Sequence, residues 1–325
     1  MNVTGCWLAT LLALAVGPVA AEAPKPAVFV TLGTAGGPRV RVKRSEPANA
    51  VVINGATYLF DVGDGVQRQL AAAHLALADV RAIFISHHHV DHNAGLGPLI
   101  ITRWLMSPKG ALPIFGPPGT RAMADGLIAA NQGTLIAPVT VGGPPPPPIA
   151  TTIRATDLDP RIDDPLLVYR DENIRVTTIG VDHFHLPPGT PAARIPRAYA
   201  YRIEAGGRVF VFTGDTGPSA NLVKLARGAD VLVSEVVDLK AIEADLRRRS
   251  TVSARELGPM MEHMRQDHLT PDAIGRLASA AGVKEVVLTH FVPGLDSETD
   301  QTGYTTGIAT TFSGQVILAR DLDRF

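Results

Sequence analysis

The sequence is poor in cysteine. Cys6 is the only one among 325 residues, so the chain cannot form an intramolecular disulfide. Its stability must come from an apolar core, and 46% apolar residues over this length are enough for one large globular domain. Cys6 lies within the signal peptide predicted below, so a metal site in the remaining chain must use histidine, aspartate or glutamate.

The sequence also lacks an excess of either charge. Lys and Arg number 30 and Asp and Glu number 31, which gives a formal net charge of −1. The basic residues are scattered and form no stripe of the kind that binds nucleic-acid backbones. Nucleic acid is therefore not an expected partner. The sequence leaves the oligomeric state open, and a homo-oligomer is one alternative.

Long apolar runs are scarce, and the one of note extends from Cys6 to Val16. It is too short to span a membrane, so no stable membrane insertion is expected, and a single anchor is the alternative. Gly17 and Pro18 follow, and Val19 and Ala21 occupy the small-residue positions of a cleavage site. The sequence predicts a signal peptide at residues 1–21 and a periplasmic or secreted domain at residues 22–325.

The remainder of the chain alternates strand-like and helical segments. Hairpin turns are predicted at Asn54-Gly55 and Gly206-Gly207. Strands are predicted for the β-branched and aromatic runs at residues 27–37, 49–62, 80–86, 174–183, 199–212, 229–236, 284–291 and 313–320. Five consecutive prolines at residues 144–148 predict a surface excursion over about residues 132–170, either a stiff loop or a lid. The pattern is compatible with two packed sheets flanked by helices.

The stretch "AIFISHHHVDHNAG", residues 82–95, contains four of the ten histidines. Side chains alternate faces along an extended segment, so His87 and His89 point to one side and His88 to the other. A turn directly afterwards brings Asp91 and His92 back toward the same space. Imidazole and carboxylate ligands suit Zn²⁺, so this strand end predicts a metal site that excludes His88.

One strand end cannot complete such a site. Three further candidates stand where an apolar strand-like run meets a turn: His183 in "GVDHFH", Asp215 in "VFTGDTG" and His290 in "VVLTHF". Because the carboxyl ends of strands converge on one edge of a sheet sandwich, we expect these side chains to join the first cluster.

These motifs, in this order, resemble the metallo-β-lactamase superfamily and, within it, the branch that includes ribonuclease Z and secreted arylsulfatases. The resemblance covers most of residues 22–325 and also includes the segments "TLGTAGGP", "LFDVGDGVQRQL" and "DVLVSEV". It implies an α/β fold of the αββα type, a sandwich of two mixed β-sheets flanked by helices.

The resemblance also implies a dinuclear centre. His87, His89 and His183 would hold one ion, Asp91, His92 and His290 the other, and Asp215 would bridge the two, with Asp61 orienting the site from behind. Two Zn²⁺ ions are the first choice, with Mn²⁺ or Fe²⁺ as alternatives.

A second pair is implied by the same branch. Glu235 would contact His268 and favour its protonated form, so that this imidazole can protonate a leaving oxygen. The alternative is that His268 only caps the helix that follows Thr270-Pro271. His185 and His263 are expected to be supporting or surface residues.

The sequence thus predicts an exported dinuclear hydrolase of small-molecule esters. Aryl sulfates or phosphodiesters come first, attacked by a hydroxide shared between two ions, with Asp91 also accepting a proton. Lactones or other carboxyl esters are the next alternative. β-Lactam hydrolysis is disfavoured by Asp215, and tRNA 3′ processing by the signal peptide and the missing basic arm. A catalytically idle metal-binding protein is the remaining alternative.

Overall fold

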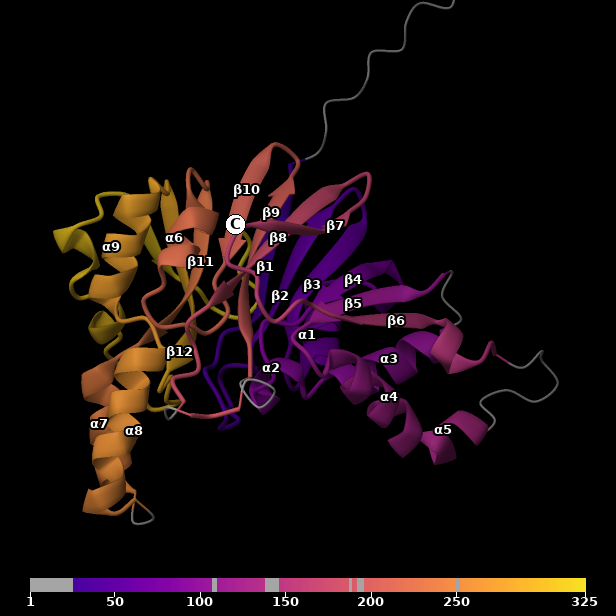
Figure 1. Cartoon of the computed structure of the whole chain (residues 1–325), viewed down its shortest axis with the longest axis horizontal. Coiled ribbons are helices and arrows are strands. Elements are labelled where there is room, and N and C mark those ends of the chain that lie inside the picture. Colours follow the sequence, from indigo (N-terminus) through magenta and orange to yellow (C-terminus); the bar gives the residue numbers. More distant parts are fainter. Residues whose placement is uncertain (1–25, 107–109, 138–145, 187–188, 192–195, 250–251) are drawn as a thin grey trace, which may run out of the picture.

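The computed structural model describes residues 26–106, 110–137, 146–186, 189–191, 196–249 and 252–325 (Figure 1). The predicted signal peptide lies outside these residues. Within the described part of the chain, no helix is both long and apolar enough to cross a membrane.

The amino-terminal half forms a six-stranded mixed sheet. Its strands lie in sequence order, with β1–β3 antiparallel and β3–β6 parallel. The strands are β1 (Val28–Gly33), β2 (Ala48–Ile53), β3 (Ala56–Val62), β4 (Val80–Phe84), β5 (Leu112–Gly116) and β6 (Ile153–Asp157). Asn54 and Gly55 form the predicted turn between β2 and β3, with φ angles of 51° and 77°.

The carboxyl-terminal half forms a seven-stranded mixed sheet in the order β13-β12-β11-β10-β9-β8-β7. Strands β7–β10 are antiparallel, and β10–β13 are parallel. The strands are β7 (Leu166–Arg170), β8 (Ile174–Val181), β9 (Ala198–Ala205), β10 (Arg208–Phe212), β11 (Val231–Val237), β12 (Glu285–Val292) and β13 (Gln315–Leu318). The predicted turn at Gly206-Gly207 joins β9 to β10, and both residues have positive φ.

Aromatic side chains fill the space between the two sheets. Phe60 of the first sheet stacks on Phe84 with ring centroids 4.9 Å apart, and it also contacts Tyr201 of the second sheet at 5.8 Å. All three side chains are fully buried. Offset and tilted aromatic contacts of this kind fix how the two sheets pack on each other.

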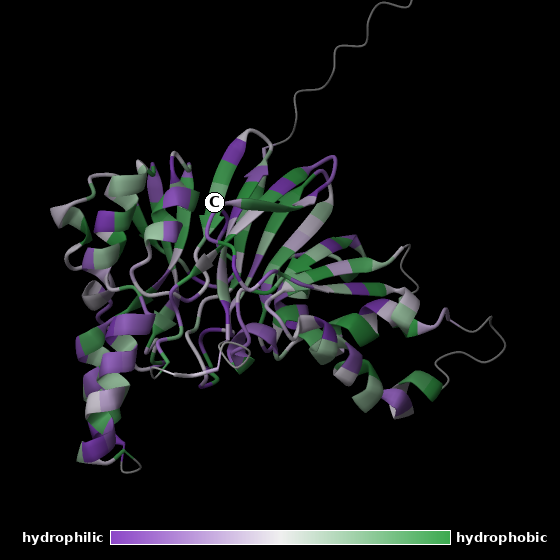
Figure 2. Ribbon diagram, viewed as in Figure 1, coloured by the Kyte–Doolittle hydropathy of each residue, from purple (hydrophilic) through white to green (hydrophobic). Residues whose placement is uncertain are grey.

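Helices cover the outer face of each sheet (Figure 1). On the first sheet these are α1 (Val66–Ala72), α3 (Leu96–Leu105), α4 (Thr120–Ala130) and α5 (Gln132–Ile136), with the short α2 (Val90–Asn93) at the strand ends. On the second they are α6 (Ala220–Ala226) and α9 (Pro271–Ala281), whereas α7 (Leu239–Arg248) and α8 (Ala254–Asp267) pack on each other and extend beyond the strand ends (Figure 1). Figure 2 shows hydrophobic residues along the strands and many hydrophilic ones on α7 and α8. The predicted αββα sandwich is confirmed.

The stretch at residues 132–170 is more ordered than a proline-rich excursion. It contains α5, a 3-10 turn at Ile149–Thr151, and the strands β6 and β7. Strand β6 pairs with β5 in the first sheet, whereas β7 pairs with β8 in the second. This stretch therefore contains the crossover between the sheets, and the prediction of an excursion over its whole length is wrong. The described prolines, residues 146–148, are exposed.

Candidate metal centre

Three imidazoles and a carboxylate form the first ligand group. His87 and His89 follow β4, His183 follows β8, and Asp215 follows β10. The His89 Nδ1 atom lies 2.9 Å from His87 Nε2 and 3.2 Å from His183 Nε2. Each of the four residues offers one ligand atom, and these atoms all lie within 4.8 Å of one another. The expected convergence of strand ends is therefore present.

A second ligand group lies beside the first. It consists of Asp91 and His92 from α2 and His290 from β12. The Nε2 atoms of His92 and His290 are 3.2 Å apart, and each lies 3.5 Å from Asp91 Oδ2. Asp215 Oδ2 lies 3.4 Å from His92 Nε2 and 3.2 Å from His290 Nε2. One carboxylate thus borders both groups, the position that the resemblance implies for Asp215.

The donor chemistry of these groups fits two divalent cations. Burial lowers the pKa of His87 and His89 and lowers that of His183 to about 3, so the three imidazoles are neutral and offer lone pairs. Burial alone would raise the pKa of Asp215, but the charges of His290 and His92 hold it well below its usual value. Burial alone would lower the pKa of these two imidazoles, but the neighbouring carboxylates raise it, so each must release a proton to bind a cation.

A buried carboxylate oxygen at the centre also indicates a cation. Among the described residues, Asp215 Oδ1 has no hydrogen-bond partner. An unpaired carboxylate oxygen away from water is costly, and a bound cation is one way to satisfy it. The cluster is therefore consistent with a dinuclear metal site.

His290 and Glu235 reach the site through an irregularity in the second sheet. Strands β11 and β12 lose their regular register between Ser234 and Val236, which pair with Leu288 and Phe291. Strand β12 therefore carries one extra residue, and His290 in this bulge has a φ of 44°. Bulges next to active sites re-aim side chains, and here the bulge turns His290 toward Asp91 and Asp215.

Asp61 supports the site from behind, as the resemblance implies. His92 Nδ1 donates to Asp61 Oδ2 at 2.7 Å, which leaves Nε2 of His92 facing the ligand group. Ser86 donates to the same carboxylate from its backbone N–H and from its hydroxyl, both at 2.7 Å. Asp61 is fully buried and has a φ of 60°. It fixes the tautomer and orientation of His92.

Gly37 supports the second group through its backbone. Its backbone N–H donates to Asp91 Oδ2 at 2.9 Å. A Cβ atom at this position would lie 2.2 Å from the carboxyl carbon of Asp91, so no larger residue can approach so closely. This contact gives the "GTAGGP" motif a physical role at the centre.

His88 points away from the ligand groups, as the strand alternation predicts. Its Nε2 lies 3.2 Å from Thr120 Oγ1 and 3.4 Å from the carbonyl oxygen of Pro117. Its Nδ1 lies 3.5 Å from the Asn93 amide nitrogen. These contacts tie the strand end to α4 instead of to the metal centre.

Glu235 and His268 form the predicted pair. His268 Nδ1 donates to Glu235 Oε2 at 2.6 Å, and both side chains are buried. Burial alone would lower the pKa of His268, but the charge and hydrogen bond of Glu235 raise it to about 9. Thr270, not His268, caps α9, because its side chain accepts from the backbone N–H of Ala273. The capping alternative is therefore wrong.

His185, His263 and Asp267 form a further cluster beside the centre. The Asp267 carboxylate accepts from Nδ1 of His185 through one oxygen and from Nδ1 of His263 through the other. The backbone carbonyl of Asp267 accepts from His183 Nδ1 at 2.8 Å. Both outer histidines are partly exposed, as expected, whereas the contribution of Asp267 is new. Only the four-residue spacing of His263 and Asp267 on α8 could have indicated it.

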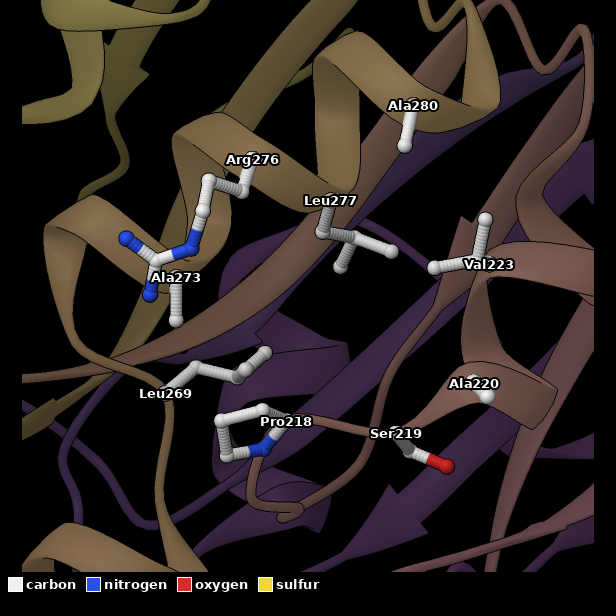
Figure 3. A pocket seen from close by; sticks show the side chains of 9 residues that line it. All are labelled: Pro218, Ser219, Ala220, Val223, Leu269, Ala273, Arg276, Leu277 and Ala280. Atoms are coloured by element: carbon white, nitrogen blue, oxygen red, sulfur yellow. The ribbon is translucent and has the colours of Figure 1, made fainter.

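An apolar groove lies away from these ligands (Figure 3). It has a volume of about 290 Å³ and lies between α6 and α9. The lining consists of Pro218, Ser219, Ala220, Val223, Leu269, Ala273, Arg276, Leu277 and Ala280. No member of either ligand group lines it, so it is not the site of the chemistry.

Comparison with known proteins agrees with this geometry. Residues 56–291 match the family described as "Beta-lactamase superfamily domain". The chain is 30% identical to a ribonuclease Z of Mycolicibacterium paratuberculosis over 304 residues, covering 91% of this chain and 97% of that one. It is 32% identical to a ribonuclease Z of Mycolicibacterium gilvum, covering 91% and 95%.

A solved structure gives the same fold. The short form of human tRNase Z superposes with a TM-score of 0.62 at 23% identity, covering 92% of this chain and 98% of that one. The protein is therefore a metallo-hydrolase of the αββα class. It belongs to the metallo-β-lactamase superfamily and, within it, to the ribonuclease Z-like branch.

Proposed function

We propose that the protein is a dinuclear, zinc-dependent phosphodiesterase. The observation that carries this is Asp215, whose carboxylate borders two separate groups of histidine ligands. Its ligand atom also lies within 4.8 Å of those of the buried Glu235–His268 pair. Two-metal sites of this kind suit the displacement of an oxygen from phosphorus. Relatives named ribonuclease Z, at about 30% identity along most of the chain, favour phosphodiesters over aryl sulfates.

The ligands in this proposal are the seven residues of the two groups. They are His87, His89, His183, Asp91, His92, His290 and the shared Asp215. When bound, the two cations would lower the pKa of a water molecule and polarise the ester oxygen. Zinc is favoured because the donors are imidazoles and carboxylates.

The chain's own residues complete the chemistry. Asp91 belongs to the second group, and its Oδ2 can accept a proton from the attacking water while the backbone N–H of Gly37 holds this oxygen in place. His268 stores a proton on an imidazole whose pKa Glu235 raises. Its Nε2 is free of the Glu235 contact and can donate that proton to the departing oxygen.

RNA is the second candidate substrate, and the relatives favour it. Precursor tRNA with a 3′ extension is the natural probe, because the similar proteins are named ribonuclease Z and tRNase Z. The expectation that nucleic acid is not a partner rests on net charge and a missing basic arm, and these relatives weigh against it. Small phosphodiesters fit the absence of a basic stripe, so the two substrates must be tested side by side.

Export of the protein would affect the choice between RNA and small phosphodiesters. We propose that residues 1–21 direct the protein out of the cytoplasm, because their apolar run and small residues fit a cleaved signal peptide. An exported enzyme would meet extracellular or periplasmic phosphodiesters instead of precursor tRNA. The intact mass of the protein from its native host tests this, since cleavage after Ala21 removes a defined mass.

A substrate panel tests the function. The metal-loaded protein is incubated with bis-p-nitrophenyl phosphate, p-nitrophenyl sulfate, a lactone, a chromogenic cephalosporin and a 3′-extended precursor tRNA. Chelator-reversible cleavage of the phosphodiester supports the proposal, and trimming of the tRNA supports the second candidate. Turnover of the sulfate, lactone or cephalosporin alone contradicts both. An inert, metal-loaded protein would indicate a binding module without catalysis.

A further inference from the structure

The segment after β8 places an aromatic ring on the metal centre. Phe184 directly follows the ligand His183, and its ring centroid lies 4.7 Å from that of His183. The same ring lies 5.3 Å from His89 and 6.0 Å from His87. Phe184 therefore contacts all three imidazoles of the first ligand group. It is only partly buried, as is His89 beside it, so this side of the group opens to solvent.

A second planar ring also borders His183. The imidazole of His263, on α8, has its centroid 6.4 Å from that of His183 and 5.8 Å from that of His268. Its side chain is 43% exposed. Phe184 and His263 thus both border His183, and both are partly exposed to solvent.

Asp267 fixes His183 and the histidines beside it. Its carboxylate is nearly buried and accepts from Nδ1 of both His263 and His185, while its backbone carbonyl accepts from His183. One residue at the end of α8 therefore fixes a metal ligand and the two histidines beside it. Because the rings are fixed before a substrate arrives, binding costs little side-chain entropy.

We propose that Phe184 and His263 form a subsite for a planar aromatic group attached to the reacting phosphate, with Asp267 and His185 as positioning residues. The inference rests on the proposed function and adds a substrate class to it. An aromatic ring can stack on a phenyl or imidazole face without any charge on either partner. Both a nucleobase and a simple aryl ring have such a face, so the chemistry is shared and the experiment must separate the two sources.

Binding without turnover tests the subsite. Isothermal titration calorimetry measures the Kd of the metal-loaded protein for adenosine 5′-monophosphate against ribose 5-phosphate, and for phenyl phosphate against methyl phosphate. Each pair shares its phosphate and differs in the aromatic group. We expect the aromatic member of at least one pair to bind about 10-fold more tightly, the scale of one stacked base.

Substitutions assign the preference to the named rings. Phe184→Ala and His263→Ala should reduce the aromatic preference to about twofold or less, with ribose 5-phosphate and methyl phosphate affinities unchanged, whereas Phe184→Trp should retain it. His74→Ala, at an exposed position on the first sheet's side, is the matched histidine control and should change nothing. Loss confined to the adenosine pair identifies a nucleobase site, and loss confined to the phenyl pair an aryl site.

Two results would overturn the subsite. One is a wild-type protein without aromatic preference in either pair. The other is a Phe184 variant that loses metal and binds all four ligands equally weakly, since Phe184 would then only pack against the imidazoles. If Phe184→Ala does not fold, Phe184→Leu and His263→Ala carry the test. Hydrolysis of bis-p-nitrophenyl phosphate without aromatic preference would reject the subsite and leave the phosphodiesterase standing, whereas aromatic preference without hydrolysis would do the reverse.

Discussion

Glu235 Oε2 and His268 Nδ1 are 2.6 Å apart, and the two side chains come from β11 and from the end of α8. Asp215, which borders both ligand groups, lies within reach of the same pair. The proton on His268 is therefore held beside the centre at neutral pH, where a departing alkoxide needs it. This contact favours an acid role for His268, and the dependence of kcat on the leaving group distinguishes that role from a purely structural one.

His268→Gln should slow the release of poor leaving groups. For an alkyl phosphodiester we expect kcat to fall by about 10² to 10³, because the leaving oxygen must depart unprotonated. For bis-p-nitrophenyl phosphate the loss should be small, since p-nitrophenolate needs no acid. Glu235→Gln should show the same pattern more weakly. An equal loss of kcat for both substrates would argue against the acid role.

Asp61→Ala should weaken the second ligand group without removing a ligand. His92 would lose the carboxylate that fixes its tautomer, and we expect metal affinity to fall by about 10- to 100-fold. Competition with a chromogenic chelator measures this. Asp61→Asn is the conservative control and should lose less, because its amide oxygen can still accept from His92. Unchanged affinity in Asp61→Ala would contradict the supporting role.

His87→Ala and His88→Ala form a matched pair. The two residues are neighbours in one strand end, but only His87 belongs to a ligand group. We expect His88→Ala to keep its full metal content, measured by inductively coupled plasma mass spectrometry, and His87→Ala to lose at least one ion per chain. Loss of metal in His88→Ala would show that both faces of the strand end serve the site.

Asp171 provides a test of the fold that is independent of the metals. Its Oδ2 accepts from Tyr58 of the first sheet at 2.6 Å and from Tyr169 of the second at 2.9 Å. Burial alone would raise its pKa, but the hydrogen bonds from Tyr58 and from backbone N–H groups lower it below the usual value. Its contribution to stability is thus present above the unfolded-state pKa of about 3.9 and is lost as pH falls through the folded-state pKa.

Asp171→Asn should therefore destabilise the protein at pH 7 and not in acid. We expect a melting temperature roughly 3 °C lower at pH 7, equivalent to about 1 kcal/mol, because a charge-assisted hydrogen bond is weakened. The difference should shrink as the pH falls below about 4. Differential scanning calorimetry across this range checks the sign, and a difference that grows toward acid pH would contradict it.

The predictable part of the site follows from short-range geometry. Strand alternation separates His87 and His89 from His88. The apolar run before His87 predicts where β4 ends. The positions of His183, Asp215 and His290 at strand ends made them candidates, the family resemblance assigned them to the two ions, and the structure brings all of them together. The local pattern was compatible with two packed sheets, and the resemblance implied the αββα sandwich.

The remainder depends on tertiary contacts that no local pattern encodes. The bulge that turns His290 toward Asp215 arises from pairing between β11 and β12, and its cause is spread over both strands. Asp267 gains its role only when α8 packs beside the end of β8. The strands β6 and β7 lie at the edges of their sheets and contain no buried residue, and the neighbouring prolines led to the wrong prediction of an excursion.

The most direct test of a shared two-metal centre is the metal content and activity of Asp215→Ala beside the wild-type protein. We predict about two ions per wild-type chain and chelator-reversible hydrolysis of bis-p-nitrophenyl phosphate. Asp215→Ala should remain folded by circular dichroism, lose metal and fall to background hydrolysis. Full metal content with wild-type hydrolysis in this variant would contradict the assignment of Asp215 as the residue that joins the two ligand groups.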